Sequence, residues 1–382
     1  MSSYYGGNYW RARWASWQDA RAGRRAQANA RWGGLKLPGD RGPVLWLQGG
    51  AAYDELRLGV ELCRAISEKR RDLRMILTFE AEDSGLFPAS TTGIDRLGYG
   101  FGPCAHPQAL RTTLERLQPL RYLGLGRVPS PALARLLRAE KRPALSMATL
   151  PAAGAQDVLW EAVYPRSQEQ YRQWQRLSLG IVVQEPVDFL TLVTVAQVEP
   201  NFRSLILGSQ GDALFWVRGL TSRDWAPWQE AWRASPLPGR GLLFLEGEGA
   251  PAALPTLSAW QRELQPVGSI LRVDEARWHP ALAAAVDAVH LQNTTDAALW
   301  QIFAGGRPLS RCPECSWDLP AEPESQPVTL SNPPSVLAHW QTLLADPIAA
   351  REEADAYRRF FWQQRRLAGE RLPEFLQRVF DW

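Results

Sequence analysis

The chain has 382 residues, with 43 Lys and Arg against 40 Asp and Glu, so its formal net charge is +3. This near-balance argues against a general nucleic-acid-binding protein, which would carry a larger positive excess. An apolar fraction of 45% and a charged fraction of 22% exclude disorder for most of the chain, and four cysteines are too few for a disulfide scaffold.

Residues 1–43 form a leader that differs from the rest of the chain in charge. They carry +6, whereas the other 339 residues carry −3. Within the leader, Trp10, Trp14 and Trp17 recur at helical spacing, so on a helix they would share one face while arginines surround them. This composition is typical of a helix lying on an anionic membrane surface. Packing of the tryptophans on the protein's own body or on a partner subunit is the alternative.

No run of apolar residues is long enough to span a membrane, and the N-terminus lacks the apolar core of a signal peptide. We therefore expect a soluble cytoplasmic protein, with contact to the inner face of the cytoplasmic membrane as a further expectation for the leader.

From Pro43 onward, short apolar runs alternate with helical stretches, which is typical of an α/β fold. The first half is predicted to be doubly wound, because a strand, helix, strand unit is almost always right-handed and parallel. Its expected strands are 44–47, 74–79, 121–125 and 143–147, and its expected helices are 54–69, 109–117 and 131–139.

The second half continues the alternation less regularly, and the secondary structure of the tryptophan-dense stretch 216–232 is not clear from the sequence. Expected strands there are 180–184, 202–208, 242–245, 288–291 and 307–311. Expected helices are 167–176, 280–286, 297–303, 335–345, 349–367 and 373–380.

Four stretches are similar to bacterial Kdo transferases, which move 3-deoxy-D-manno-octulosonic acid from its CMP-linked form to a lipid A precursor. They are Arg31-Trp32-Gly33-Gly34-Leu35 with the following 42–50 segment, then 72–78, 278–309 and 343–347. The resemblance implies a glycosyltransferase of the B type (GT-B), in which two Rossmann-like domains face each other across a cleft and C-terminal helices follow. It implies a role in lipopolysaccharide biosynthesis, inverting transfer without a metal or other cofactor, a CMP-linked sugar donor, and a lipid or glycan acceptor.

On this resemblance the chain divides into four parts: the leader 1–43, an N-terminal acceptor domain 44–180, a C-terminal donor domain 181–350 and C-terminal helices 351–382. The family's catalytic glutamate falls at Asp54 or Glu55, where a carboxylate could accept the proton of the acceptor hydroxyl. The alternative is that both acids only complement the N-terminus of their helix.

The remaining expected site residues lie in glycine-rich turns and in the donor domain. Gly49 and Gly50 could let the backbone approach a ligand, although tight turns explain them equally well. The resemblance places Ser209, Gln210, Asn293, Thr294, Thr295 and Gln301 near the nucleotide.

Several charged positions of the family are absent, at Leu125, Thr149 and Gln301 among others, which indicates drift away from its reaction. The alternative function is therefore a catalytically inactive binding or assembly subunit that acts through tryptophan-rich surfaces, with residues 216–232 as the first such surface. A lone Cys312-Pro313-Glu314-Cys315 motif is interpreted as two ordinary thiols, because zinc sites generally need two such halves.

Overall fold

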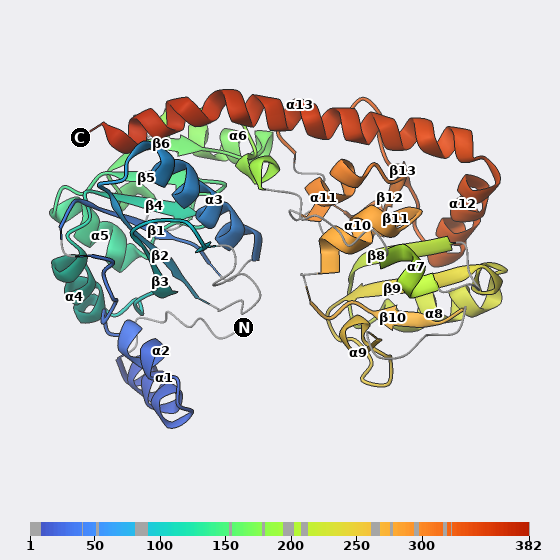
Figure 1. Ribbon diagram of the computed structural model, residues 1–382, viewed down its shortest axis with the longest axis horizontal. Coiled ribbons are helices and arrows are strands. Elements are labelled where there is room, and N and C mark those ends of the chain that lie inside the picture. The colour runs from blue at the N-terminus through green and yellow to red at the C-terminus, as the bar shows by residue number, and fades with distance from the viewer. Residues whose placement is uncertain are drawn as a thin grey trace. The chain divides into compact units, whose positions relative to one another are not determined.

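The computed structural model describes residues 9–39, 41–50, 53–80, 91–152, 155–177, 180–193, 202–207, 213–260, 268–275, 278–293, 298–315, 319–321 and 323–381, except for the side chains of Arg11, Tyr53, Asp54, Leu207, Trp260 and Ala298. Two compact units are present (Figure 1). The first comprises Met1–Val193, Leu319–Ala321 and Leu367–Trp382, and the second comprises Thr194–Asp318 and Glu322–Arg366.

The first unit is built on a parallel sheet whose strand order is β3-β2-β1-β4-β5-β6-β7 within the described residues. The strands are β1 (Val44–Gln48), β2 (Arg74–Phe79), β3 (Leu97–Phe101), β4 (Arg121–Leu125), β5 (Ala144–Met147), β6 (Trp160–Tyr164) and β7 (Val182–Val183). β1 pairs with β2 on one side and with β4 on the other, so the winding direction reverses between β1 and β4. The expected doubly wound domain is thus confirmed.

Helices α3 (Tyr53–Lys69), α4 (Pro107–Leu117), α5 (Pro131–Ala139) and α6 (Gln168–Arg176) cover this sheet (Figure 1). Local sequence sets where two of them begin. The Ser130 hydroxyl accepts the N–H of Leu133 ahead of α5, and the Ser167 hydroxyl accepts the N–H of Gln170 at α6. Prolines at the starts of α4 and α5 occupy positions where no N–H is needed.

The second unit repeats the design with the order β10-β9-β8-β11-β12-β13. Its strands are β8 (Ala213–Leu220), β9 (Gly241–Gly247), β10 (Ile270–Arg272), β11 (Ala288–Leu291), β12 (Leu309–Arg311) and β13 (Val328–Thr329), all parallel. The helices are α7 (Phe202–Leu207), α8 (Trp225–Ala234), α9 (Leu257–Trp260), α10 (His279–Ala285), α11 (Ala298–Gly305) and α12 (Pro333–Ala345). Here the reversal lies between β8 and β11.

The tryptophan-dense stretch 216–232 is the core of the second unit, not a surface. Trp216 lies on β8, whereas Trp225, Trp228 and Trp232 lie on one face of α8, and all four are at most 2% exposed. Trp340 of α12 joins this core. The expectation that this stretch forms a contact surface is therefore wrong, because the tryptophans recur at the spacing that turns them toward the sheet.

Two further expectations on secondary structure are wrong. Residues 202–208 were expected to be a strand, but Phe202–Leu207 is a helix whose Phe202 and Ile206 are buried four residues apart. Residues 349–367 and 373–380 were expected to be separate helices, but α13 runs unbroken over Pro347–Phe380 with Pro373 inside it. Burial of Phe375 and Val379 after the proline outweighs the roughly 3 kcal/mol that an internal proline costs a helix.

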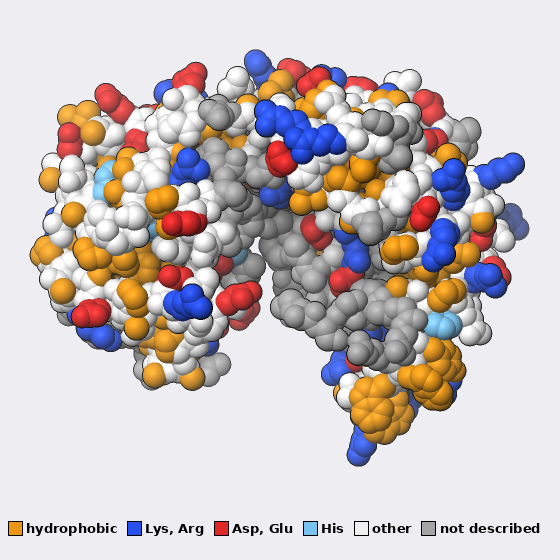
Figure 2. Space-filling model, turned by 180° about the vertical axis from the view of Figure 1, so that it is seen from behind, with side chains coloured by type: hydrophobic (Ala, Val, Ile, Leu, Met, Phe, Trp, Pro, Cys, Tyr) orange, Lys and Arg blue, Asp and Glu red, His pale blue; other side chains and the backbone are white. Residues whose placement is uncertain are grey.

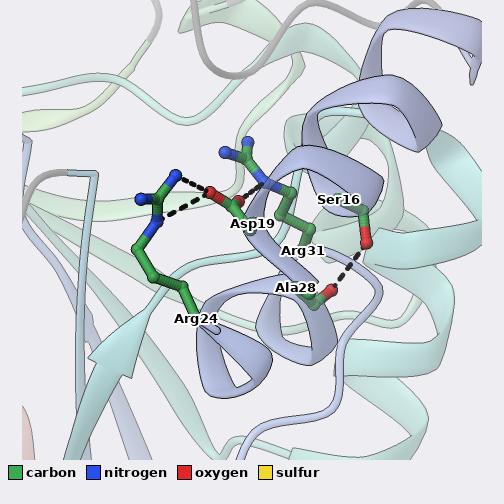
Figure 3. A network of polar contacts seen from close by, with 5 residues as sticks. All are labelled: Ser16, Asp19, Arg24, Ala28 and Arg31. Atoms are coloured by element: carbon green, nitrogen blue, oxygen red, sulfur yellow. Dashed lines mark hydrogen bonds and ion pairs between the residues drawn. The ribbon is translucent and has the colours of Figure 1, made fainter. Parts of the chain in front are cut away.

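The leader forms a helical hairpin of α1 (Tyr9–Arg21) and α2 (Arg25–Ala30) (Figure 3). Asp19 lies between the helices, where it is 3% exposed and accepts hydrogen bonds from Arg24 on one carboxylate oxygen and from Arg31, at 2.7 Å, on the other. The Ser16 hydroxyl also donates to the Ala28 carbonyl oxygen. The hairpin is therefore held by a buried charge with two partners.

We expect Asp19→Asn to destabilise the hairpin by about 3–5 kcal/mol, because removal of one partner leaves the buried Arg31 guanidinium without its counter-charge. Amide hydrogen exchange across α1 and α2, with thermal unfolding of the whole chain, measures the loss. Asp72→Asn is the matched control, since Asp72 pairs with Arg70 at the surface and its side chain is 54% exposed. Equal hydrogen exchange in both variants would contradict this role of Asp19.

Candidate functional site

Open α/β sheets bind ligands at the carboxyl ends of their strands, at the point where the winding direction reverses. In the first unit this edge is formed by the residues that follow β1 and β4. Gly49 and Gly50 follow β1, and Gly126 follows β4 with a positive φ of 67°. The glycine pair expected from the sequence therefore lies at the switch point of the sheet.

The Glu55 side chain, in the first turn of α3, lies against the backbone of this edge. Its Oε2 accepts the N–H of Gly50 at 2.7 Å. A Cβ atom on Gly126 would overlap the same carboxylate, so Glu55 lies directly against the backbone that follows β4. The Gly49 N–H donates to the Thr78 carbonyl oxygen. The structure thus brings Gly49, Gly50 and Glu55 together, and the N–H groups of both glycines are engaged within the protein.

An ion pair extends this edge to the next strand. Arg127, directly after Gly126, pairs with Glu80, directly after β2, and the Glu80 N–H donates to the Gly50 carbonyl oxygen. The resemblance implies acidic residues at positions 125–127, where this chain has Leu125, Gly126 and Arg127. The structure supplies two carboxylates to that position from other segments, Glu55 and Glu80. The side chain of Asp54 lies outside the described residues.

We expect Gly126→Ala to destabilise the protein by about 1–3 kcal/mol, because the new Cβ strains a left-handed backbone and displaces the Glu55 carboxylate. Chemical denaturation measures the change. Adding Glu55→Ala to Gly126→Ala removes the overlap, so the double variant should lose less stability than the two single losses added together. Gly100→Ala serves as the control, because no atom lies within 4 Å of a Cβ there. Strict additivity would show that Glu55 does not occupy this space.

In the second unit, the residues that follow β11 lie at the switch point between β8 and β11. The Gln292 N–H donates to the Arg218 carbonyl oxygen of β8, and Asn293 is exposed directly after it. Ser209, Gln210, Thr294 and Thr295 lie outside the described residues, so their predicted roles stay predictions.

Gln301 lies in α11, the helix that follows this loop. Its side-chain oxygen Oε1 is buried and accepts no hydrogen bond from any group in the described part of the chain. A buried acceptor without a donor costs about 1–3 kcal/mol. Gln301 is therefore a polar group for which an incoming hydroxyl or N–H would supply the missing bond.

A cluster of largely buried polar side chains, which no sequence motif predicted, lies on β8, β9 and α10. Arg218 of β8 is 2% exposed and donates to both carboxylate oxygens of Glu246 on β9, at 3.0 and 3.1 Å. His279, the first residue of α10, contacts Glu246 Oε1 through Nε2 at 2.9 Å. The indole N–H of Trp216 donates to the same carboxylate. Three segments far apart in the sequence thus converge on one carboxylate.

Burial disfavours the charged form of Glu246, but the Arg218 guanidinium and His279 outweigh burial and hold the pKa of this carboxyl well below its usual range. Clusters of this kind are more frequent at functional sites than elsewhere. The sequence contained one weak indication of this cluster: Arg218 and Glu246 are charged residues near the ends of two strands whose other positions are largely apolar.

A second histidine, His290 of β11, is buried beside this edge. Its Nδ1 lies 3.0 Å from the Ser310 hydroxyl and its Nε2 lies 3.3 Å from Gln292 Oε1. Burial lowers the pKa of His290 from 6.5 to about 4. The imidazole is therefore neutral in the folded protein at neutral pH.

The depressed pKa of His290 predicts that stability falls on acidification. Between pH 6.5 and about pH 4 the unfolded chain binds a proton at His290 that the folded chain does not. The free energy of unfolding therefore has its full value, as far as His290 is concerned, above pH 6.5 and decreases as the pH falls to about 4. The total decrease in the free energy of unfolding over this pH range is about 3 kcal/mol. Urea unfolding at several pH values should show this extra slope relative to His290→Gln. Parallel pH profiles of the two proteins would contradict it.

The described residues hold no group of three or more His, Cys, Asp or Glu side chains arranged to bind a metal ion. Cys312 and Cys315 are both buried free thiols, and the Cys312 thiol contacts the Glu314 carboxylate at 2.6 Å. The interpretation of this motif as two ordinary thiols stays a prediction.

A hollow of about 600 Å³ lies at the opposite, amino edge of the second sheet, near the start of β11. Two of its arginines are engaged within the protein: Arg307 donates to the Ala283 and Ala284 carbonyl oxygens, and Arg358 pairs with Asp355. Because ligands of this fold class bind at the carboxyl edge, the switch points remain the candidate site.

Comparison with known proteins places this architecture in a class. No protein-family model and no curated protein matches the sequence. Among solved structures, Anabaena Alr3699/HepE in complex with UDP-glucose is similar over 88% of this chain and 100% of its own, at 12% identity and a TM-score of 0.58. A Neisseria meningitidis UDP-GlcNAc 2-epimerase bound to UDP-GlcNAc is similar over 87% of this chain and 100% of its own, at 10% identity and a TM-score of 0.56.

Phytolacca americana UGT2, complexed with UDP-2fluoro-glucose and pterostilbene, is similar over 89% of this chain and 100% of its own, at 11% identity and a TM-score of 0.54. The protein has the two-domain α/β, GT-B-like fold of these structures. None of the three is described as a Kdo transferase, so that finer resemblance rests on the sequence motifs alone.

Proposed function

We propose that the protein is a glycosyltransferase that transfers a sugar from a nucleotide donor to a lipid or glycan acceptor. The GT-B-like fold supports this function, as do the UDP-sugars named in the similar structures. The observation that carries the proposal is Gln301, which lies on the helix that follows the β8/β11 switch point and whose buried Oε1 accepts no hydrogen bond from the described residues.

The donor binds at the carboxyl edge of the second sheet in this proposal. Gln301 Oε1 accepts a ribose hydroxyl, in place of the glutamate that the resemblance assigns to this position. The Asn293–Thr295 loop, Ser209 and Gln210 complete the nucleotide site. The resemblance favours a CMP-linked donor and the similar structures favour a UDP-linked one, so the proposed donor carries a pyrimidine nucleotide.

The reaction in this proposal is an inverting transfer that uses no metal. The acceptor oxygen forms a bond to the anomeric carbon as the bond to the nucleotide phosphate breaks, and a carboxylate takes the acceptor's proton. Glu55 is one candidate for this base, because its carboxylate lies at the switch point of the first sheet, and Asp54 is the other.

One observation favours the alternative of an inactive binding subunit. The N–H groups of Gly49 and Gly50 are both engaged, so this turn offers a phosphate no open backbone donor. That alternative first depended on residues 216–232 as a contact surface, but the tryptophans of this stretch are buried in the core of the second unit. Nucleotide binding separates the two functions.

We expect UDP or CMP, tested at millimolar concentration with GDP for comparison, to raise the thermal unfolding midpoint of the protein. Gln301→Met should weaken nucleotide binding roughly ten- to hundredfold, because the ribose hydroxyl loses its acceptor. The same change should leave the unliganded protein equally stable or more stable, since it removes an unsatisfied buried oxygen. Calorimetric titration and thermal shift measure both effects.

Gln229→Met is the matched control. Gln229 is a partly buried glutamine of α8 whose amide donates to the Trp225 carbonyl oxygen within the helix, so nucleotide affinity should not change. Absence of any shift with all three nucleotides would remove the support for a transferase. Binding that is unaffected by Gln301→Met would overturn the role of this side chain.

A further inference from the structure

The leader hairpin presents three indole side chains to solvent. Trp10, Trp14 and Trp17 of α1 are 75%, 60% and 48% exposed, and the rings of Trp14 and Trp17 stack with centroids 5.1 Å apart. Figure 2 shows large hydrophobic side chains gathered at the end of this hairpin, with basic side chains beside them. The alternative in which these tryptophans pack on the protein's own body is therefore wrong for the described chain.

Contacts on the other side of the hairpin keep these three tryptophans exposed. The opposite side of α1 is fixed to the first unit, because Ala12 packs with Cys104 and Ala109. The ring of Tyr9 also contacts those of Trp32 and His106 at 5.6 and 5.3 Å. Asp19, held by Arg24 and Arg31, fixes α2 against α1 (Figure 3). One face of the hairpin is thus anchored while the tryptophan face stays in water, where three large aromatic side chains would otherwise be expected to be covered.

Charge on the exposed side of the hairpin has a single sign. Arg13, Arg21, Arg24 and Arg25 are exposed. Asp19 is the only acidic residue in 9–39, and it is buried between two guanidinium groups. The Arg21 guanidinium lies 5.2 Å from the ring centre of Trp17, which places a positive charge directly beside the indoles.

We propose that the leader hairpin binds the surface of an anionic lipid bilayer, with Trp10, Trp14 and Trp17 at the level of the headgroups and the arginines on the lipid phosphates. Indoles favour the membrane interface because they combine an apolar ring with a polar N–H. Uniform positive charge matches an extended anionic surface better than the mixed charges of a protein partner.

The attachment is peripheral in this proposal. No helix in the described ranges is both long and apolar enough to cross a membrane. The exposed tryptophans alternate with polar and basic residues along a single helix, so only one face can enter the interface. This attachment does not depend on sugar transfer: loss of nucleotide binding and loss of vesicle binding are separate results.

The test is co-sedimentation of the full chain with vesicles. Vesicles that contain phosphatidylglycerol should bind the protein, vesicles of phosphatidylcholine alone should bind it at least roughly tenfold less, and added salt should weaken binding. A combined Trp10→Ala, Trp14→Ala, Trp17→Ala variant, and separately Arg21→Gln with Arg25→Gln, should each lower binding roughly tenfold or more.

Matched controls lie elsewhere on the surface. Trp362 of α13 is 56% exposed with the Arg365 guanidinium 5.7 Å from its ring centre, so Trp362→Ala removes an equivalent pair and should leave binding unchanged. Arg172→Gln with Arg176→Gln on α6 is the control for charge. Hydrogen exchange across α1 and α2 verifies that the hairpin stays folded in each variant.

Several results would overturn the proposal. They are full vesicle binding by the triple tryptophan variant with its hairpin folded, equal binding to both kinds of vesicle, and equal losses in the Trp362→Ala control. Capture of a single-stranded oligonucleotide without vesicle binding would also overturn it and assign the face to nucleic acid instead.

Discussion

Parallel pairing of β1 with β2 and β4, and of β8 with β9 and β11, constrains everything else in this molecule. A parallel sheet needs a crossover between successive strands, so helices cover both faces and the strands become almost wholly apolar. Loops at the carboxyl edge, where strands end and helices begin, are then free to carry polar side chains. Glu55, Glu80 and Arg127 gather at that edge in the first unit, and Asn293 lies there in the second.

The two edges differ in how their polar groups are engaged. In the first unit, Glu55 takes the N–H of Gly50 and lies against Gly126, so a side chain occupies the position that an anion would take in a glycine-rich turn. In the second unit, Gln301 Oε1 accepts no hydrogen bond from the part of the chain that the structure describes, whereas Glu246 is engaged by Arg218 and His279. This difference is the physical reason that the proposed nucleotide site lies in the second unit.

Regular alternation made most of the fold predictable. Strands at 74–79, 121–125 and 288–291 and the helix at 131–139 have the expected bounds. Strands β6, β8 and β10 were not expected, and two further exceptions have a physical reason. Pro373 stays inside α13 because Phe375 and Val379 are buried after it, and the glycine-rich strand β3 was not expected, because its few apolar residues show no clear period. Of the candidate site, the sequence indicated Gly49, Gly50, Glu55 and Gln301, but not the Arg218, Glu246 and His279 cluster, whose members are adjacent only in the folded chain.

Tryptophan separates what the sequence determined from what the structure decided. Spacing alone placed Trp10, Trp14 and Trp17 on one helical face, and the sequence set the +6 charge of the leader around them. Spacing of the same kind puts Trp225, Trp228 and Trp232 on one face of α8. The first set is exposed and the second is buried, because α8 packs on a sheet with its tryptophan face, whereas α1 is anchored by Ala12 and Asp19 on its other side. Periodicity defines which residues share a face, and only the partner that a helix meets in the fold decides whether that face is core or surface.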